Sequence, residues 1–186
     1  MFRSVRDKDV IVRLGYPKVT PLISSGDFEN GNLMAATWHT HLSGIPPLYG
    51  VSIAPDRYTY KLIKETGEFG VNFLPFRLYE LVWKCGLVSG ANVDKFEKFK
   101  IRKMRGKVIK APLVEESIVI LECKVTKDVK VGDHVFFVGE IVHAWVRDNL
   151  LLSKGILDIT GDKHVYYLGR GNFCTIDKNT VKSLKN

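Results

Sequence analysis

Two long alternating stretches on either side of a glycine turn constrain the fold of this chain most. In Ile118–Thr126 successive side chains alternate between two faces, as they do along a β-strand. A turn containing Gly132-Asp133 follows, and His134–Val146 then alternates again, with both of its faces largely apolar. A strand that is apolar on both faces is covered on both. We therefore expect His134–Val146 to lie at the centre of a sheet or at a subunit interface.

Shorter strands surround this pair. Runs of apolar residues bounded by turn residues predict strands at Leu33–Trp38, Leu48–Ala54 and Phe69–Phe73, with a loop at His39–Pro47. Many strands, few long helices and several turn glycines favour a mainly β fold. The architecture that fits best is a small closed β-barrel with short inserted α-helices.

Apolar residues at helical spacing predict three short helices. We expect these helices at Asp56–Gly67, Leu78–Cys85 and Val93–Phe99. Asp56 is a suitable N-cap for the first of them, and Gly67 and Gly86 are suitable stops for the first and second. The helices are too short and too few to change the mainly β assignment.

The chain is expected to form one domain. Its 186 residues can bury a substantial core, and neither an internal repeat nor a linker rich in Pro, Gly or Ser divides them. With 45% hydrophobic and 26% charged residues the composition is globular rather than disordered. We expect the core to span about residues 15–170, and the polar tail 172–186 to lie on the surface or to cross to a partner.

Neither a membrane nor an extracellular location is indicated. The longest apolar runs are too short to span a bilayer, and the charged N-terminus does not resemble a signal peptide. Cys85, Cys123 and Cys174 are odd in number and far apart, which argues against a disulfide framework and shows no CxxC metal spacing. The expected location is the cytoplasm.

The net charge of +8 raises the question of nucleic-acid binding. The basic residues are spread along the chain, however, and the densest cluster is Lys95–Lys110. Such a cluster is typical of a solvated face, and it also suits an anionic cofactor or NADPH. A non-enzymatic basic barrel that binds nucleic acid therefore stays an alternative, but a disfavoured one.

A glycine loop before the third helix suits a phosphate group. Ser89 and the Gly90 backbone N–H can donate hydrogen bonds, glycine lets an anion approach closely, and Lys95 supplies a positive charge. A solvated turn before an amphipathic helix has the same pattern. The loop becomes informative only beside other segments.

Several segments in this order resemble the flavin reductase-like family, whose fold is the FMN-binding split barrel, and within it the flavoredoxin-type members. The resemblance covers about Gly31–Gly169. Its motifs are Asn32–Trp38, Pro46-Pro47 with Ser52–Thr59, Thr66–Asn72, Cys85-Gly86 with Ser89-Gly90 and Asp94–Phe96, and Gly132–His134 with Gly139-Glu140. Each motif is weak alone, but their joint order and spacing are specific.

The resemblance implies a flavin site. Residues expected at the flavin ring, or on the loop beside it, are Asn32, Thr37, Trp38, His39, His134 and Tyr167. Those expected at the FMN phosphate are Arg57, Thr59, Ser89, Gly90 and Lys95. Free backbone N–H groups at the start of a helix favour an anion near Arg57 and Thr59. Tyr166 aligns as well as Tyr167 at the ring.

The pair His39 and His41 raises the separate question of a metal. On a strand, residues two apart share a face, so the pair could begin a zinc site. A third ligand at suitable spacing is not apparent. We expect no metal.

The expected function is that of an FMN-binding oxidoreductase, an NAD(P)H-dependent flavin reductase in which a hydride passes from NADH or NADPH to flavin N5. Because the flavin carries the electron chemistry, no catalytic acid–base residue is required for that step, and none is assigned. The chain lacks GxGxxG after a strand, so a nicotinamide would bind without a Rossmann domain. The alternative is a flavoredoxin-like electron carrier that holds FMN and exchanges electrons with a partner protein. The resemblance also implies a homodimer with the flavin near the subunit interface.

Overall fold

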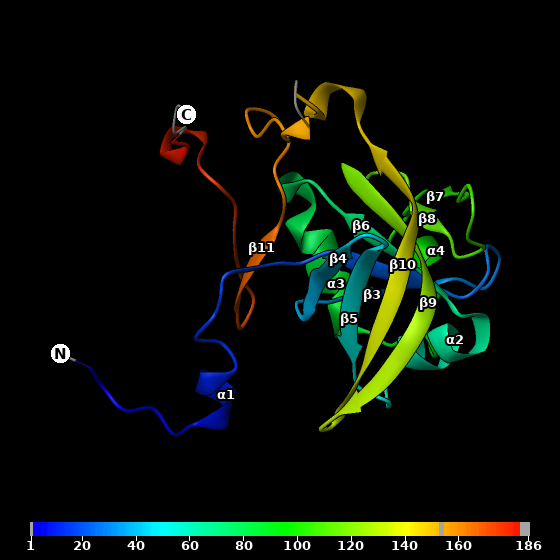
Figure 1. The fold of residues 1–186 in the computed structure, drawn as a ribbon, viewed down its shortest axis with the longest axis horizontal. Helices are drawn as coiled ribbons and strands as arrows, with labels where there is room; N and C mark the ends of the chain where they lie inside the picture. The colour runs from blue at the N-terminus through cyan, green and yellow to red at the C-terminus, as the bar shows by residue number, and fades with distance from the viewer. Residues whose placement is uncertain (1, 153–154, 183–186) are drawn as a thin grey trace.

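A curved antiparallel β-sheet forms the centre of the molecule (Figure 1). The computed structural model describes residues 2–152 and 155–182. The sheet has seven strands in the order β3-β2-β6-β9-β10-β5-β4, so its two edges, β3 and β4, are consecutive along the chain. Its strands are β2 (Leu22–Ser25), β3 (Asn32–Ala35), β4 (His39–Gly44), β5 (Pro47–Ile53), β6 (Glu68–Phe73), β9 (Val119–Val131) and β10 (His134–Val146).

Two small sheets and short helices complete the fold. The small sheets are β1 (Lys18–Val19) with β11 (Tyr166–Gly169) and β12 (Asn172–Cys174), and β7 (Lys103–Met104) with β8 (Leu113–Val114). The α-helices are α1 (Lys8–Ile11), α2 (Tyr58–Thr66), α3 (Tyr79–Leu87) and α4 (Lys95–Lys98), and 3-10 turns lie at Phe76–Leu78, Asp148–Leu150 and Lys178–Thr180. Among the described residues, no helix is long and apolar enough to cross a lipid bilayer.

The predicted central hairpin is confirmed. Strand β10 begins at His134 and ends at Val146, as expected, and it pairs with β9 on one side and β5 on the other. Strand β9 is longer than predicted, because it continues past Thr126 to Val131. Phe137 of β10 is fully buried in the main core. β10 is therefore central in the sheet, with one face buried in the core and the other, which carries Phe136 and Val138, half-buried.

A second core fixes the helices that follow β6. Val82 and Cys85 of α3 and Phe96 of α4 pack with Leu22 and Leu33 of β2 and β3. Burying side chains of this size stabilises the fold by about 1.5–3 kcal/mol each. This packing holds α3 and α4 against β3, and with them the loop that joins the two helices.

The region between β3 and β5 differs from the sequence prediction. The expected strand Leu33–Trp38 ends at Ala35, and the expected loop His39–Pro47 contains strand β4, which pairs with β5. Several β4 side chains are exposed because this strand is at the sheet edge. Polar residues on a solvated edge strand look like loop residues in the sequence.

The ends of the helices also correct the prediction. The N-cap of α2 is Arg57 and not Asp56, whereas Gly67 ends α2 in the left-handed region at φ 69°, as expected. Gly86 does not end the second helix, because α3 continues through it to Leu87. The third helix is shorter than Val93–Phe99 and spans Lys95–Lys98, with Asp94 as its N-cap.

Helix α4 ends in a motif that favours glycine. Ile101 N–H donates to the Phe96 carbonyl at 2.8 Å, and Lys100 N–H donates to the Glu97 carbonyl at 3.1 Å. These are the two bonds of a Schellman motif. Its left-handed position is held by Lys100, at φ 54°. A non-glycine residue in this conformation costs about 1–2 kcal/mol.

A buried carboxylate ties the loop before β8 to the main sheet. The fully buried Glu122 accepts hydrogen bonds from the backbone N–H groups of Lys107, Val108 and Ile109, at 2.7–2.9 Å, and from Trp145 Nε1 at 2.7 Å. Burial alone would raise the pKa of this carboxyl, but the four donors outweigh burial and hold the pKa below its usual value. Every contact of Glu122 is therefore used to hold the fold.

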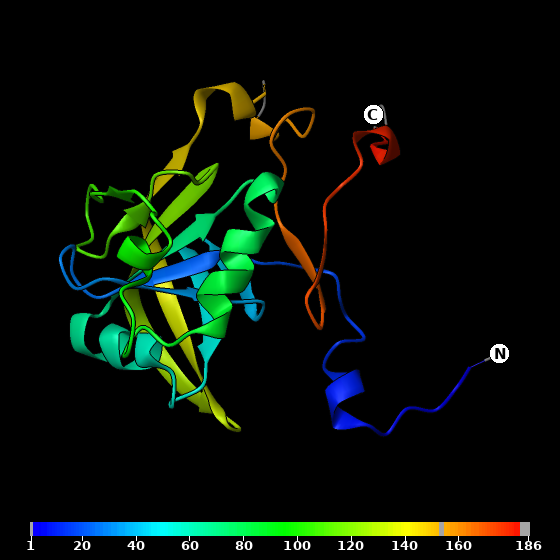
Figure 2. The ribbon, with the colours of Figure 1, turned by 180° about the vertical axis from the view of Figure 1, so that it is seen from behind.

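Both ends of the described chain extend from the barrel on the same side (Figures 1 and 2). The expected surface tail 172–186 begins with β12, which pairs with β11, so its first residues belong to a sheet. Residues 183–186 lie outside the described residues.

Candidate functional site

A cleft of about 730 Å³ collects the residues that the sequence singled out. Ten of the eleven predicted site residues line this cleft, and they come from distant parts of the chain. They are Asn32, Thr37, Trp38, Arg57, Thr59, Ser89, Gly90, Lys95, His134 and Tyr167. The fold therefore brings together the ring-side and phosphate-side residues implied by the family resemblance.

A buried amide with one unused oxygen lies at the wall of the cleft. Asn32 is 3% exposed, and its Nδ2 donates to Thr59 Oγ1 at 2.8 Å. Its Oδ1 has no hydrogen-bond partner among the described residues. An unpartnered buried acceptor costs about 1–3 kcal/mol. Because the Thr59 hydroxyl accepts from Asn32, its own proton remains available. The pair thus offers one acceptor and one donor to a ligand.

Gly90 leaves the space that this arrangement needs. A Cβ atom built on Gly90 would lie 2.0 Å from Asn32 Oδ1 and 2.5 Å from Asn32 Cγ. Real Cβ atoms do not approach other atoms so closely, so any larger residue at Gly90 displaces the Asn32 amide. The close packing of the loop after α3 on Asn32 of strand β3 therefore requires glycine at position 90.

The first turn of α2 lies at one end of the cleft and has chemistry that suits an anion. Backbone N–H groups in the first turn of a helix have no partner within the helix, and they carry a partial positive charge. The N-cap Arg57 makes no side-chain cap bond, and the first turn of α2 holds no acidic residue. Tyr58 and Thr59 of this turn both line the cleft. The Arg57 side chain adds a cation, and its exposed pair with Asp56 at 3.7 Å is weak.

Lys95 is placed beneath the cleft rather than on its surface. The residue is 3% exposed, and its Nζ donates to the carbonyls of Leu33 at 2.6 Å and Cys85 at 2.7 Å. Burial lowers the pKa of the Lys95 ammonium. The sequence predicted a phosphate ligand, but the structure shows a group that also joins β3 to α3. An ammonium has three hydrogens, so one is left for a ligand.

The Cys85 side chain does not act as a nucleophile in this setting. Burial raises the pKa of its thiol to about 12, although the charge of Lys95 opposes that change. A thiol with this pKa is protonated at neutral pH, and the thiolate is the reactive form. Cys85 therefore contributes packing and a backbone carbonyl to the site.

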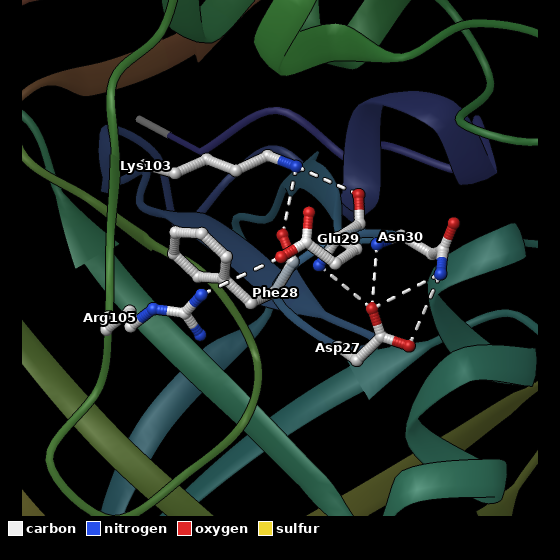
Figure 3. Close-up of polar contacts among 6 residues, drawn as sticks. All are labelled: Asp27, Phe28, Glu29, Asn30, Lys103 and Arg105. Carbon is white, nitrogen blue, oxygen red and sulfur yellow. Dashed lines mark hydrogen bonds and ion pairs between the residues drawn. The ribbon is translucent and has the colours of Figure 1, made fainter.

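The tight turn between β2 and β3 fixes the start of β3, where Asn32 lies. Asp27 Oδ1 accepts the backbone N–H groups of Glu29 at 2.9 Å and Asn30 at 2.7 Å. Lys103 Nζ donates to the Phe28 and Glu29 carbonyls, both at 3.0 Å. The Arg105 guanidinium lies 3.9 Å from the centre of the Phe28 ring (Figure 3). Two basic residues of the Lys95–Lys110 cluster, Lys103 and Arg105, thus hold this turn. No sequence pattern indicated this role.

Aromatic side chains line another part of the cleft. The rings of Trp38 and His134 are 4.8 Å apart at 45°, and Trp38 is 38% exposed. His134 Nδ1 lies 2.7 Å from Asp133 Oδ1, and this hydrogen bond and the His134 charge lower the pKa of the Asp133 carboxyl. An exposed indole beside an imidazole offers a surface on which a planar ligand can stack.

The two adjacent tyrosines are distinguished by the structure. Tyr167 lines the cleft, and its ring is 5.0 Å from Phe173 and 6.1 Å from Trp83. Tyr166 is not among the residues that line the cleft. The assignment of Tyr167 at this position is the one that the geometry supports.

The sequence did not identify the N-terminal residues that line the same cleft. Val12, Arg13 and Tyr16 line it, and the Tyr16 hydroxyl lies 3.1 Å from Thr37 Oγ1. A short polar stretch before β1 carries no pattern that distinguishes it from a solvated arm. Only the folded chain shows that this arm returns to the cleft.

His39 is the one predicted site residue that does not line the cleft. Its ring stacks on Tyr49, its Nδ1 bonds the Tyr49 hydroxyl, and its Nε2 lies 2.8 Å from the Val19 carbonyl. Burial lowers the pKa of His39. Because β4 is a strand and not a loop, His39 is directed into these contacts. Among residues 2–152 and 155–182, no three His, Cys, Asp or Glu side chains lie together to hold a metal ion.

Comparison with known proteins gives the family. The model of the flavin reductase like domain matches residues 13–176. A solved FMN-binding protein from Thermus thermophilus, with bound 1-cyclohex-2-enone, has a TM-score of 0.87 and 31% identity, covering 98% of this chain and 100% of that one. A flavoredoxin from Methanosarcina acetivorans has a TM-score of 0.86 and 28% identity, covering 100% and 96%.

Two further similarities bear on the fold and the chemistry. A Shewanella frigidimarina protein whose structure holds a split barrel domain has a TM-score of 0.86 and 26% identity, covering 98% of this chain and 94% of that one. The ferric-chelate reductase (NAD(P)H) of Archaeoglobus fulgidus is 31% identical over 107 residues, which are 56% of this chain and 62% of that relative. The fold is the split barrel, and the chain belongs to the flavin reductase-like family.

Proposed function

We propose that this protein is an FMN-binding oxidoreductase of the cytoplasm, with FMN held in the cleft between β3, α2 and the loop after α3. The observation that carries the proposal is the buried Asn32 Oδ1, which has no partner among the described residues and faces Gly90. A buried acceptor without a partner, in a residue that lines a cleft, indicates a ligand with a donor. The three free cysteines support a reducing compartment.

The chemistry of the cleft fits the two ends of FMN. Its volume of about 730 Å³ lies in the range of cofactor sites. The first turn of α2, Arg57 and the buried Lys95 suit a phosphate dianion. Trp38 and Tyr167 suit a flat, largely apolar ring system, and the Asn32 amide, which lies beside Thr59, suits a hydroxyl of the chain that joins the ring to the phosphate.

The residues of this chain would bind and orient, and the flavin would supply the redox chemistry, accepting a hydride at N5 from NADH or NADPH. Arg57, Thr59 and Lys95 would hold the phosphate and exclude bulk water from it. Trp38 and His134 would pack against the ring. The similarity to the Archaeoglobus ferric-chelate reductase (NAD(P)H) supports the nicotinamide as donor.

A second candidate is an electron carrier that holds FMN and exchanges electrons with a partner protein. The similarity to the Methanosarcina flavoredoxin, at 28% identity over the full chain, favours this candidate. The cleft serves both functions equally, because both need the same FMN contacts.

We also propose a homodimer in which the arms of each chain cover the partner. Apolar residues of the arms are exposed and could be covered by a partner: Ile11 at 48%, Leu14 at 66% and Leu168 at 44%. Both arms extend to the same side of the barrel (Figure 2). Arg13 and Tyr16 of the N-terminal arm also line the cleft, so a dimer seated there would lie beside the flavin. Sedimentation velocity should give twice the chain mass, and a monomer at micromolar concentration would contradict the dimer.

Anaerobic mixing of the FMN-loaded protein with NADH, and separately with NADPH, tests the reductase function. We expect at least one of them to bleach the flavin absorbance within seconds. If neither does so, while dithionite reduces the bound flavin, the reductase proposal is wrong and the electron-carrier proposal is favoured.

A further inference from the structure

We propose that a second cavity, between α3 and α4, binds a phosphorylated nucleotide, for which ADP is the probe. The cavity has a volume of about 560 Å³ and is lined by the 3-10 turn Phe76–Leu78, by α3 and by the end of α4. None of its lining residues lines the flavin cleft. It is therefore a separate feature of the molecule.

The floor of the cavity is apolar and aromatic. Leu78, Leu81 and Phe99 are half-buried, and Tyr79 also lines the cavity, although its ring packs on Phe76 at 5.5 Å and on Phe173 at 5.6 Å. These side chains are fixed by the second core, against which Leu78, Leu81 and Phe99 pack. Such a floor suits a flat aromatic group such as a purine base.

The rim of the cavity is strongly cationic. It carries Arg77, Lys84, Lys98 and Lys100 and a single acidic residue, Glu80. Four cations from separate segments converge around one acid, so the local charge is positive. An anion with several oxygens would relieve this repulsion.

Two of the four cations are free to bind an anion. Arg77 pairs with Asp162 at 3.4 Å and Lys84 with Glu80 at 3.7 Å, both at exposed positions. For Lys98 and Lys100, the described part of the chain offers no carboxylate within 4.0 Å. Exposed ion pairs are weak, so Arg77 and Lys84 can also turn to a phosphate.

The backbone at Lys100 is the second observation that points to a ligand. Lys100 holds the left-handed position of the Schellman motif, at φ 54°, where glycine is favoured. Departures of this kind from a local rule concentrate at functional sites. The strained position directs a lysine from the end of α4 to the rim of the cavity.

The size and chemistry of the cavity identify the ligand class. A volume of about 560 Å³ fits a mononucleotide better than a free phosphate. The base would lie on Phe99, and the phosphates would lie between Lys98 and Lys100. A ligand that combines an aromatic base with a polyanion would account for both the apolar floor and the cationic rim of the cavity.

Calorimetric titration of ADP tests this proposal, with adenosine and pyrophosphate as separate arms and with the protein either free or saturated with FMN. We expect ADP to bind at least tenfold more tightly than adenosine or pyrophosphate, and with equal affinity in the presence of FMN. Pyrophosphate binding as tight as that of ADP would reduce the cavity to a general anion patch and overturn the nucleotide assignment. Displacement of ADP by FMN would place the binding in the flavin cleft and overturn the proposal.

Variants separate binding from folding. Lys100→Gly removes the charge and relieves the left-handed strain, so we expect a melting temperature equal to or above that of the wild type. The double variant Lys98→Ala/Lys100→Gly should bind ADP at least tenfold more weakly. The matched control Lys127→Ala/Lys130→Ala removes the same charge from exposed positions on the β9–β10 hairpin and should bind within twofold of wild type. Unchanged affinity in the first double variant, or an equal loss in the control, would contradict the site.

Discussion

Two buried polar clusters in this molecule differ in whether their acceptor atoms have hydrogen-bond partners. The Glu122 carboxylate, on β9, accepts four hydrogen bonds from Lys107, Val108, Ile109 and Trp145. At the cleft, Asn32 Oδ1 has no partner in the described part of the chain, although the residue is 3% exposed. Both clusters lie in the same small domain and are shielded from water to a similar degree.

The difference separates groups that hold the fold from groups that await a ligand. A fully satisfied buried carboxylate gains nothing from an added molecule, and its loss leaves several N–H groups unpaired. An unsatisfied acceptor lowers the stability of the free protein and gains a bond when a donor binds. Substitutions in the Glu122 cluster should therefore change stability without changing ligand affinity. Substitutions at the cleft should change affinity more than stability.

The largest effect is expected for Glu122→Ala. Removing the acceptor of four donors should lower the free energy of unfolding by about 3–5 kcal/mol, measured by urea denaturation. FMN affinity at a temperature where the variant is folded should stay within twofold of wild type. The exposed Glu65→Ala serves as control and should change stability by less than about 0.5 kcal/mol. A parallel loss of FMN affinity in Glu122→Ala would remove the distinction between the two clusters.

The pH dependence of the Glu122 cluster follows from its lowered pKa. Because the folded-state pKa is below the unfolded value, the stabilisation is present above the unfolded pKa, and it is lost as the pH falls through the folded pKa. The stability difference between wild type and Glu122→Ala should therefore shrink as the pH falls below about 4.5.

The next effect is expected for Lys95→Met, which keeps the aliphatic volume. Two carbonyls lose their donor, so the free energy of unfolding should fall by about 1–3 kcal/mol. FMN affinity should fall by about tenfold or more, and riboflavin affinity by much less, because only FMN carries the phosphate. Fluorescence titration with both flavins measures this ratio. An equal loss for both would make Lys95 a purely structural residue, like Glu122.

A smaller effect is expected for Gly90→Ala. The added Cβ would meet Asn32 Oδ1 at 2.0 Å, so the amide must turn away from the cleft. We expect FMN affinity to fall by about tenfold, a change of about 1.4 kcal/mol. Gly44→Ala is the control, since a Cβ there meets no atom within 4 Å. If Gly90→Ala binds FMN as the control does, Asn32 does not contribute to the site.

The smallest effect is expected at His39, a half-buried polar group with both ring nitrogens bonded. Burial lowers its pKa below 6.5, so the unfolded chain takes up a proton first as the pH falls, and stability falls below about pH 6.5. His39→Gln should flatten this decline by up to about 1 kcal/mol between pH 7 and 5, with FMN affinity unchanged. The exposed His41→Gln should follow the wild-type curve. A loss of FMN affinity in His39→Gln would return His39 to the site.

The sequence predicted the central hairpin of the sheet, and ten of the eleven site residues that it predicted line the cleft. The range of β10 and the helix stop at Gly67 follow from alternation and from turn chemistry, which are local rules. Edge strand β4 was missed because its exposed residues, including His41, resemble a loop. Its register then turns His39 away from the cleft.

The burial of Lys95 and the contribution of Tyr16 lay beyond local rules. A lysine near the start of a short predicted helix suggests an exposed cation, and only the packing of α4 on β3 shows that its ammonium bonds two carbonyls. Tyr16 reaches the cleft because the N-terminal arm pairs with β11 far along the chain. Such contacts depend on tertiary structure, and neighbouring residues do not encode them.

The central claim is that the unsatisfied polar cluster at the cleft binds FMN. The visible absorption spectrum of the purified protein, before and after addition of FMN and gel filtration, tests this claim most directly. We expect a flavin band that co-elutes with the protein at one FMN per chain. A protein without a flavin band, which also fails to retain added FMN, would contradict the account.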